Sequence, residues 1–491
     1  MLSPWLRDLE DLLEVELAQG APTSPFRPAV LRWAAANGRL VDPVPLLDTL
    51  EANRIGGRGG ARRYRWSFPV AGWIALDERL RWRPAERELA ERHGAEHAAR
   101  LWVPPVLVEH VEWLDRVGRS DVPADVATRA RALLSEALPT VEDDVALRIA
   151  GVEAWGDTFL LWAFARRPRA LARVPGLVSA IASRYAARAD RTDGLVHGRS
   201  YPFFDIPMPS ATAHLAAAAA RTGEGLGMVA RAVDWLRANR RPDGGWGDPR
   251  QPTDLLTTLA VAELLGLLDA TFDPTAVLEV MEAQVKDRGG RPAMVGPEWP
   301  WLAAELLAFG SWSGKPFQER FRWPHVPQSR TDPSVNVPRK EAFFVDARLF
   351  EELPGLAGLP IECGFIDLAG FGTWNTNHGQ DTGDKLLALL TAELRRLPDS
   401  RTIRDGGDEF LVLGAPMANG LPERLQELFA RWPEVSRVRF PGLPVVPLRA
   451  VVGRGAAGEL RKLRERLGED IGPVKHEHMS PPPEGVVVPL A

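Results

Sequence analysis

Apolar residues recur with two different spacings along the chain, and the change of spacing divides the chain into two parts. From about residue 140 to 312 the spacing is helical, and a two-helix pattern returns about every 45–50 residues. In each copy a helix ends at a glycine-rich loop, and a second helix follows that is apolar around most of its circumference. The most regular copy runs from ARAVDWLRANRR through the loop PDGGWG at 242–247 into DLLTTLAVAELLGLL. This part is therefore predicted to be all-helical, with Ser210 and Thr253 capping two of the apolar helices.

Beyond about residue 340, short apolar runs replace the helical spacing. Residues 361–366 are predicted to form a strand, residues 385–397 a helix, and residues 401–404 and 410–413 two strands joined by a glycine turn. A strand, a helix and a hairpin in this order predict a ferredoxin-like palm. The intervening stretch 321–340 holds four prolines and is predicted to be a linker.

The predicted protein is therefore multidomain, with an all-α part and an α+β part. The expected boundaries are a helical repeat domain at 1–320, a proline-rich linker at 321–340 and a palm domain at 341–491. Tryptophan supports the division, because 15 of the 17 tryptophans precede residue 330.

The composition argues against several classes of function. The 491 residues are 45% hydrophobic and 25% charged, as in a globular protein, and the net charge of −5 favours neither nucleic acid nor a membrane surface as a partner. The N-terminus is acidic and amphipathic, unlike a signal peptide, and the longest near-apolar run, 255–268, is short for a membrane span. The single cysteine, Cys363, excludes an intramolecular disulfide and a multi-cysteine zinc site. The expected location is the cytoplasm.

The run Arg404-Asp405-Gly406-Gly407-Asp408-Glu409-Phe410 carries the strongest chemical signal. Two glycines lead into two acids and then into an apolar strand, which predicts a tight turn presenting adjacent carboxylates. Asp367 ends the predicted strand about forty residues upstream and is expected to face this pair across adjacent strands. Carboxylates held in this way suit Mg²⁺ and triphosphate chemistry.

Residues 367–384 and 404–409 together resemble the GGDEF domain of diguanylate cyclases, and the resemblance extends over about 332–475. The positions that match the family pattern in residues 367–384 are Asp367, Phe371, Asn375, Gly379, Gly383 and Asp384, and Arg404 matches in the second motif. The resemblance implies an enzyme that condenses two GTP molecules to cyclic di-GMP with Mg²⁺ or Mn²⁺. Because each such domain holds one GTP, it also implies a homodimer, at least during catalysis.

The resemblance further implies a role for each residue. The metal ligands would be Asp367, Glu409 and the backbone carbonyl of Leu368, and Asp408 and Glu409 would be the catalytic acids. Asn375 and Asp384 would read guanine, since a carboxylate accepts from the N1–H and N2–H₂ edge that adenine lacks. The other substrate-binding residues would be Phe371, Gly406, Gly407 and Arg404.

The chain departs from the family pattern at several positions. Ala369 replaces the second acid of the first motif, Gly372 replaces a phosphate-side lysine, and Gln380 replaces a histidine. The C-terminal helix that holds the triphosphate in the family does not align cleanly with residues 458–478. Its candidate cations here are Lys462, Arg464 and Lys475.

Residues 185–312 resemble the α/α-toroid of the squalene-cyclase and protein-prenyltransferase superfamily, in which DGGWG-type loops join outer to inner helices. The resemblance implies a central cavity for a small hydrophobic ligand and a sensory role. The zinc ligands of a prenyltransferase are missing, because the only cysteine lies in the other domain. The acidic run VEDD at 141–144 lacks the leading acid of a protonating cyclase.

Three hypotheses remain open from the sequence. The first is a diguanylate cyclase regulated by the helical domain. The second is a binding module that keeps affinity for GTP or cyclic di-GMP and has lost turnover. The third is a terpene-acting or sugar-acting toroid with a regulatory cyclase-like domain.

Overall fold

The computed structural model describes residues 3–20, 26–39, 41–52, 108–150, 154–191, 193–197, 207–249, 252–286, 299–325, 331–416, 418, 420–478 and 481–490. The chain divides into two compact units. The first comprises Met1–Ala220, Gly227–Gly266 and Asp273–Lys315, and the second comprises Arg221–Leu226, Leu267–Phe272 and Pro316–Ala491. Each unit is described by itself. Within the described ranges, no helix has the length and apolarity that crossing a bilayer requires.

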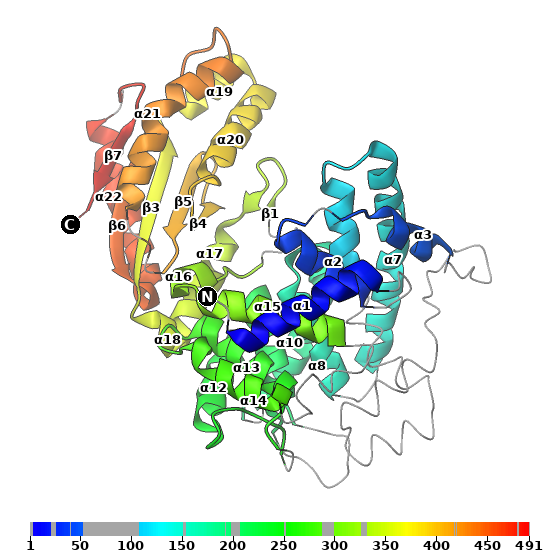
Figure 1. Ribbon diagram of the computed structural model, residues 1–491. Coiled ribbons are helices and arrows are strands. Elements are labelled where there is room, and N and C mark those ends of the chain that lie inside the picture. Colours follow the sequence, from blue (N-terminus) through cyan, green and yellow to red (C-terminus); the bar gives the residue numbers. More distant parts are fainter. Residues whose placement is uncertain are drawn as a thin grey trace. The chain divides into compact units, whose positions relative to one another are not determined.

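The described part of the first unit is built from helices (Figure 1), as its periodicity predicts. The toroid arrangement itself stays a prediction. The helices are α1 (Pro4–Gln19), α2 (Arg27–Ala36), α3 (Val44–Ala52), α7 (Ala124–Ala150), α8 (Ala154–Arg166), α9 (Pro168–Arg173), α10 (Pro175–Arg191), α11 (Pro209–Thr222), α12 (Leu226–Ala238), α13 (Leu255–Leu268), the 3₁₀ turn η1 (Pro274–Val277), α14 (Leu278–Lys286) and α15 (Trp299–Ser313), and residues 108–119 are also helical. The acidic run 141–144 lies in α7, and its side chains are outside the described part.

The loop at 242–247 shows why the repeat carries its glycines and tryptophan. Trp246 is fully buried between α12 and α13, and its indole N–H donates to the carbonyl of Leu236 at 2.7 Å. A Cβ on Gly247 would lie 2.1 Å from the carbonyl oxygen of Pro252, so only glycine fits there. The tryptophan therefore anchors the loop, and the glycine lets the chain pass close to itself.

The two predicted N-caps are wrong. Ser210 lies inside the first turn of α11, where its hydroxyl donates to the buried carboxylate of Asp248. The cap of α13 is Asp254, whose Oδ1 accepts from the backbone N–H of Thr257 at 2.8 Å. Asp254 directly precedes the helix, and its carboxylate adds a favourable interaction with the helix dipole that Thr253 lacks.

A buried ionic cluster ties five helical segments of the first unit together. Its arginines are Arg32, Arg166 and Arg167, and its glutamates are Glu109, Glu263 and Glu305. The Arg32 Nε lies 3.1 Å from Glu109, and an Arg166 guanidinium nitrogen lies 2.8 Å from Glu263. Each arginine contacts at least one of the glutamates, so opposite charges compensate one another away from water. Burial raises the pKa of Glu263 to about 7, so this glutamate is partly protonated at neutral pH.

Aromatic rings pack against this cluster. The guanidinium of Arg166 lies 4.4 Å from the centre of the Trp162 ring, and the His214 ring stacks on Trp162 at 5.1 Å. His214 is buried, and its Nδ1 lies 3.4 Å from the Thr158 hydroxyl. Burial, followed by the nearby Arg166 charge, lowers the pKa of His214 to about 3. Folding therefore requires a neutral imidazole at this position.

The second unit contains a five-stranded sheet with strand order β4-β5-β3-β6-β7. All neighbouring strands are antiparallel except β6 and β7. The strands are β3 (Pro360–Leu368), β4 (Ser400–Arg404), β5 (Glu409–Gly414), β6 (Leu448–Ala456) and β7 (Val486–Pro489). The strands predicted at 361–366, 401–404 and 410–413 are confirmed as β3, β4 and β5.

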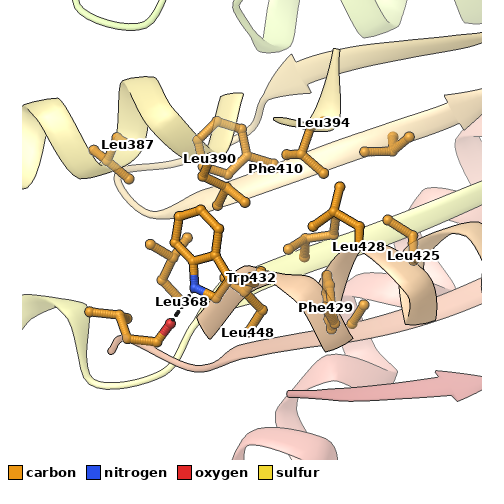
Figure 2. Packing of buried hydrophobic residues seen from close by; sticks show 14 of the residues in the cluster. Leu368, Leu387, Leu390, Leu394, Phe410, Leu425, Leu428, Phe429, Trp432 and Leu448 are labelled. Atoms are coloured by element: carbon orange, nitrogen blue, oxygen red, sulfur yellow. Dashed lines mark hydrogen bonds between the residues drawn. The ribbon is translucent and has the colours of Figure 1, made fainter. Parts of the chain in front are cut away.

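Helices cover both faces of this sheet (Figure 1). The helices of the second unit are α16 (Phe317–Arg320), α17 (Lys340–Glu352), α18 (Pro354–Ala357), α19 (Phe371–His378), α20 (Gln380–Leu394), α21 (Leu421–Arg439), the turn η3 (Ala457–Glu459) and α22 (Leu460–Glu477). Leu368, Phe410 and Leu448 from three strands pack on one face with the apolar sides of α20 and α21, as Figure 2 shows. Trp432 closes this core and donates its indole N–H to the Val446 carbonyl at 2.8 Å. The other face packs against α22, which contacts β6 and β3.

Part of the stretch expected to be a linker belongs to the second unit. Strands β1 (Thr331–Asp332) and β2 (Val337–Pro338) form a small hairpin, and β2 continues into a bridge between Arg339 and Arg404. Val335 and Val337 are buried in the core shared with the main sheet. Proline content marked this stretch as a linker, but its two valines bury enough apolar surface to hold it in place.

We expect His214 to destabilise the first unit as the pH falls below neutrality, because it must then be protonated in the unfolded chain but stays neutral when folded. Burial raises the pKa of Glu263 in the adjacent cluster to about 7, which acts in the opposite direction, so the contribution of His214 is the difference between the wild type and a His214 variant. The folded pKa of His214 is depressed, so its stabilising contribution is complete above the unfolded pKa of about 6.5 and is lost as the pH falls. Between pH 7 and 5 the loss is about 2 kcal/mol. Urea unfolding followed by tryptophan fluorescence measures it.

His214→Phe keeps an aromatic ring on Trp162, and between pH 7 and 5 its free energy of unfolding should fall by about 2 kcal/mol less than that of the wild type. His197→Gln is the matched control, since His197 is partly exposed beside Asp193, and this variant should keep the wild-type slope. Equal slopes in wild type and His214→Phe would show that another group causes the pH dependence.

Candidate functional site

The register of the sheet places three charged residues in one row. Asp367 on β3 pairs directly with Glu409 on β5 and with Arg449 on β6. Side chains alternate between faces along a strand, and Ile366, Leu368 and Phe410 belong to the core on the opposite face. Asp367, Glu409 and Arg449 therefore share the face that α22 covers. The predicted convergence of Asp367 with the acids of the glycine turn is observed.

Lys475, near the end of α22, bridges the two carboxylates. Its Nζ lies 2.7 Å from Asp367 Oδ1 and 2.7 Å from Glu409 Oε1. Burial by itself would lower the pKa of Lys475, but the hydrogen bonds to Asp367 and Glu409 outweigh it and the pKa is raised. One protonated amine thus lies at the point where the two strands present their carboxylates.

Arg449 holds the second oxygen of Asp367. Its Nε donates to Asp367 Oδ2 at 2.9 Å, and a second guanidinium nitrogen contacts the same oxygen. Another nitrogen of the same guanidinium donates to the main-chain carbonyls of Lys475 and His478, at 3.1 and 3.2 Å. Arg449 therefore fixes both the aspartate and the C-terminal turn of α22.

Asp408 is the third acid at this end of the sheet. Its main-chain carbonyl accepts from the Leu368 N–H at 3.4 Å, which joins the turn to the end of β3. Burial, followed by the negative charge of Asp367, raises the pKa of Asp408. The site thus carries three carboxyl groups against the two cations Arg449 and Lys475.

The turn that presents these acids is held by Arg404. Its guanidinium donates to the carbonyls of Gly406 at 3.1 Å and Gly407 at 2.6 Å, and also to the Asp332 carboxylate at 2.9 Å. Neither Gly406 nor Gly407 has a positive φ. A Cβ on Gly407 would meet no atom within 4 Å, so the protein itself does not demand glycine there. Arg404, expected among the substrate-binding residues, makes its observed contacts with the turn and the β1–β2 hairpin.

The other two candidate phosphate cations are engaged elsewhere. Arg464 forms a forked pair with Asp405, with nitrogen–oxygen distances of 2.7 and 2.8 Å, and the Asp405 side chain is only 5% exposed. Lys462 is exposed and pairs with Glu459 at 3.1 Å. Of the three candidates, only Lys475 reaches the acidic site.

The predicted guanine-reading residues lie together on the α19–α20 helix pair. Asn375 abuts Gly383, since a Cβ at position 383 would come within 2.0 Å of Asn375 Oδ1, and Asp384 is the next residue. Asn375 Oδ1 is buried, and no described residue donates a hydrogen bond to it. This oxygen lies against Gly383, so the α19–α20 packing itself buries it. Phe371, by contrast, is packed in the core beside Trp374, where it supports the helix pair.

The two carboxylates at the ends of β3 and β5 match, in chemistry and in number, the ligands that a hard divalent ion takes from a protein. Among the described residues, no three or more His, Cys, Asp or Glu side chains are grouped so as to hold a metal ion by themselves. Mg²⁺ commonly takes one or two carboxylates and completes its coordination with substrate phosphates and water. Asp367 and Glu409 can supply that pair, provided that the amine of Lys475 moves away from their oxygens.

Comparison with solved structures finds similar folds among GGDEF domains. The GGDEF domain of DgcB from Caulobacter crescentus, in complex with c-di-GMP, is 20% identical over 34% of this chain and 98% of its own, with a TM-score of 0.29. The FimX GGDEF domain from Pseudomonas aeruginosa is 16% identical over 33% and 99%, with a TM-score of 0.25. The diguanylate cyclase SiaD from the same organism, in complex with its activator SiaC, is 20% identical over 30% and 59%, with a TM-score of 0.27. No protein-family model and no curated protein matches this chain.

Arg449 was not anticipated from the sequence. It stands in the apolar run LRAVV, where a lone arginine is the visible signal, but only the pairing of β3 with β6 shows that it faces Asp367. Strand pairing between residues about eighty positions apart cannot be read from local spacing.

We expect Arg464→Met to lower the free energy of unfolding of the second unit by about 3 kcal/mol, because it leaves the Asp405 carboxylate buried without its partner. Arg461→Met is the matched control on the same helix, since Arg461 is 41% exposed and pairs with Glu351 at the surface. The control should change stability by less than about 0.5 kcal/mol. Chemical denaturation followed by circular dichroism measures both. Equal losses in the two variants would contradict a structural role for Arg464.

Proposed function

We propose that the second unit is a nucleotidyl cyclase of the diguanylate cyclase type, which condenses two GTP molecules to cyclic di-GMP and two pyrophosphates. One observation carries the proposal. The carboxylates of Asp367 and Glu409, from adjacent antiparallel strands, converge on a single cation at 2.7 Å each, beside the turn that bears Asp408. The motif resemblance over 367–384 and 404–409 supports the same reaction.

In this proposal each residue has a defined task. Asp367, Glu409 and the Leu368 carbonyl hold Mg²⁺ or Mn²⁺, which when bound offsets charge on the phosphates. Asp408 acts near the attacking 3′-hydroxyl, where a carboxylate can accept its proton. Arg404 keeps the turn in place through the carbonyls of Gly406 and Gly407.

Base selection is assigned to Asn375 and Asp384. Asn375 and Asp384 lie beside each other on the α19–α20 pair, and each side chain carries an oxygen that can accept a hydrogen bond. The N1–H and N2–H₂ groups of guanine are matching donors, and adenine has no such pair on that edge. Because each unit holds one GTP, turnover requires two copies of the chain to meet.

A second function, binding without turnover, is favoured by the arrangement of cations. Lys475 lies between the two carboxylates, Arg449 holds Asp367, and Arg464 is committed to Asp405. A domain kept in this state would bind GTP or cyclic di-GMP as a receiver and would catalyse no condensation.

Incubation of the full chain with GTP and Mg²⁺, with products identified by mass spectrometry, separates the two functions. We expect cyclic di-GMP from the wild type and a loss of product by at least about a hundredfold in the Asp408→Ala/Glu409→Ala variant. Nucleotide binding without product above that variant would reject the cyclase and support the receiver.

We expect Asp384→Ala to weaken GTP binding by roughly ten- to a hundredfold, because one paired base contact contributes about 1–3 kcal/mol. Asp381→Ala is the matched control, since Asp381 is exposed on the first turn of the same helix. Binding of ATP should be equally weak in all three proteins. Calorimetric titration checks this, and equal GTP affinities would remove Asp384 from the base-reading role.

A further inference from the structure

The position of Lys475 has a consequence for metal affinity. Its amine is 2.7 Å from one oxygen of Asp367 and 2.7 Å from one oxygen of Glu409. A Mg²⁺ ion bound by the same two oxygens would lie about 2.1 Å from each. Two positive charges cannot share that position, so the amine and the ion exclude one another.

The other carboxylate oxygen of Asp367, Oδ2, is not open to a metal ion. This oxygen is held by two nitrogens of Arg449, and the side chain of Asp367 is only 4% exposed. Oδ1 is therefore the oxygen open to a metal, and it is the one that Lys475 contacts. Occupation by the ion requires the lysine to leave.

The lysine is built so that it can leave without disturbing the helix. Its side chain is 32% exposed, and the amine is carried on a flexible four-carbon stem. The main-chain carbonyl of Lys475 is bound by Arg449, which keeps the last turn of α22 in place. A side-chain rotation alone can therefore open the site.

We propose that Lys475 is an internal cation that competes with a divalent ion for the Asp367–Glu409 pair, so that residue 475 sets the metal affinity of this unit. The inference rests on the proposed function for its choice of ion. Without metal the lysine compensates the two carboxylates, and with metal it is displaced into solvent.

Binding of Mn²⁺ to the full chain without nucleotide, measured by electron paramagnetic resonance, tests the competition. Lys475→Met should bind Mn²⁺ about tenfold more tightly than the wild type, because a half-buried ion pair no longer has to be broken. Lys462→Met removes the same charge from the same helix at an exposed position and should bind as the wild type does. Adding Asp367→Asn to Lys475→Met should abolish the gain, which locates the ion at this pair.

A second measurement follows the lysine itself. Acetylation of the wild type with a limiting reagent, read by mass spectrometry, should modify Lys475 several times faster when Mn²⁺ is present, while Lys462 stays unchanged. Unchanged labelling of Lys475 at saturating Mn²⁺ overturns the proposal, as does equal affinity in wild type and Lys475→Met or an absence of binding in both. These assays contain no GTP, so they are independent of turnover. Failure to make cyclic di-GMP would reject the cyclase without changing the result expected for metal binding.

Discussion

The pairing of β3 with both β5 and β6 is the constraint on which the candidate site depends. It sets Glu409, Asp367 and Arg449 side by side on the face under α22, while Leu368 and Phe410 enter the core on the other face. A slip of one residue in either pairing would exchange the two faces and bury the carboxylates among leucines. The apolar face of the sheet packs against α20 and α21 (Figure 2). Because this packing sets the strand register, it also fixes the position of the charged residues on the opposite face.

Much of the palm could be predicted from local sequence patterns, because its strands and its glycine turn are each defined by a few consecutive residues. The short apolar run at 361–366 and the two glycines before Asp408 predict β3, β5 and their meeting point, and all three are observed. What local patterns could not supply were long-range partners. Arg449 reaches Asp367 only through β6, and Lys475 reaches it only through the packing of α22 on the sheet. The N-caps failed for a different reason, since Asp254 and Thr253 both suit a cap and only the true start of α13 decides between them.

The helical unit follows a different principle of stability. Its repeat pattern predicts helices, but the spacing of apolar residues does not predict the buried ionic cluster that contains Arg167 and Glu305. Such a buried ionic cluster contributes less to stability than its contacts suggest, because desolvation offsets most of the attraction. Removing one charge, however, leaves another without compensation. The cluster is thus better understood as specifying which helices pack together than as the source of their stability.

The two cations of the palm site differ in how firmly they are held. Three acids face two cations, and the oxygens of Asp367 and Glu409 that Lys475 contacts become available only if that cation is exchanged. The Arg449 side chain is fixed by main-chain carbonyls at the end of α22, whereas the Lys475 side chain is partly exposed and is held at its amine by the two carboxylates. Exchange can therefore occur at Lys475 but not at Arg449. A site with one fixed and one replaceable cation is suited to binding a metal–nucleotide complex, a step that a cyclase and a GTP-binding receiver share.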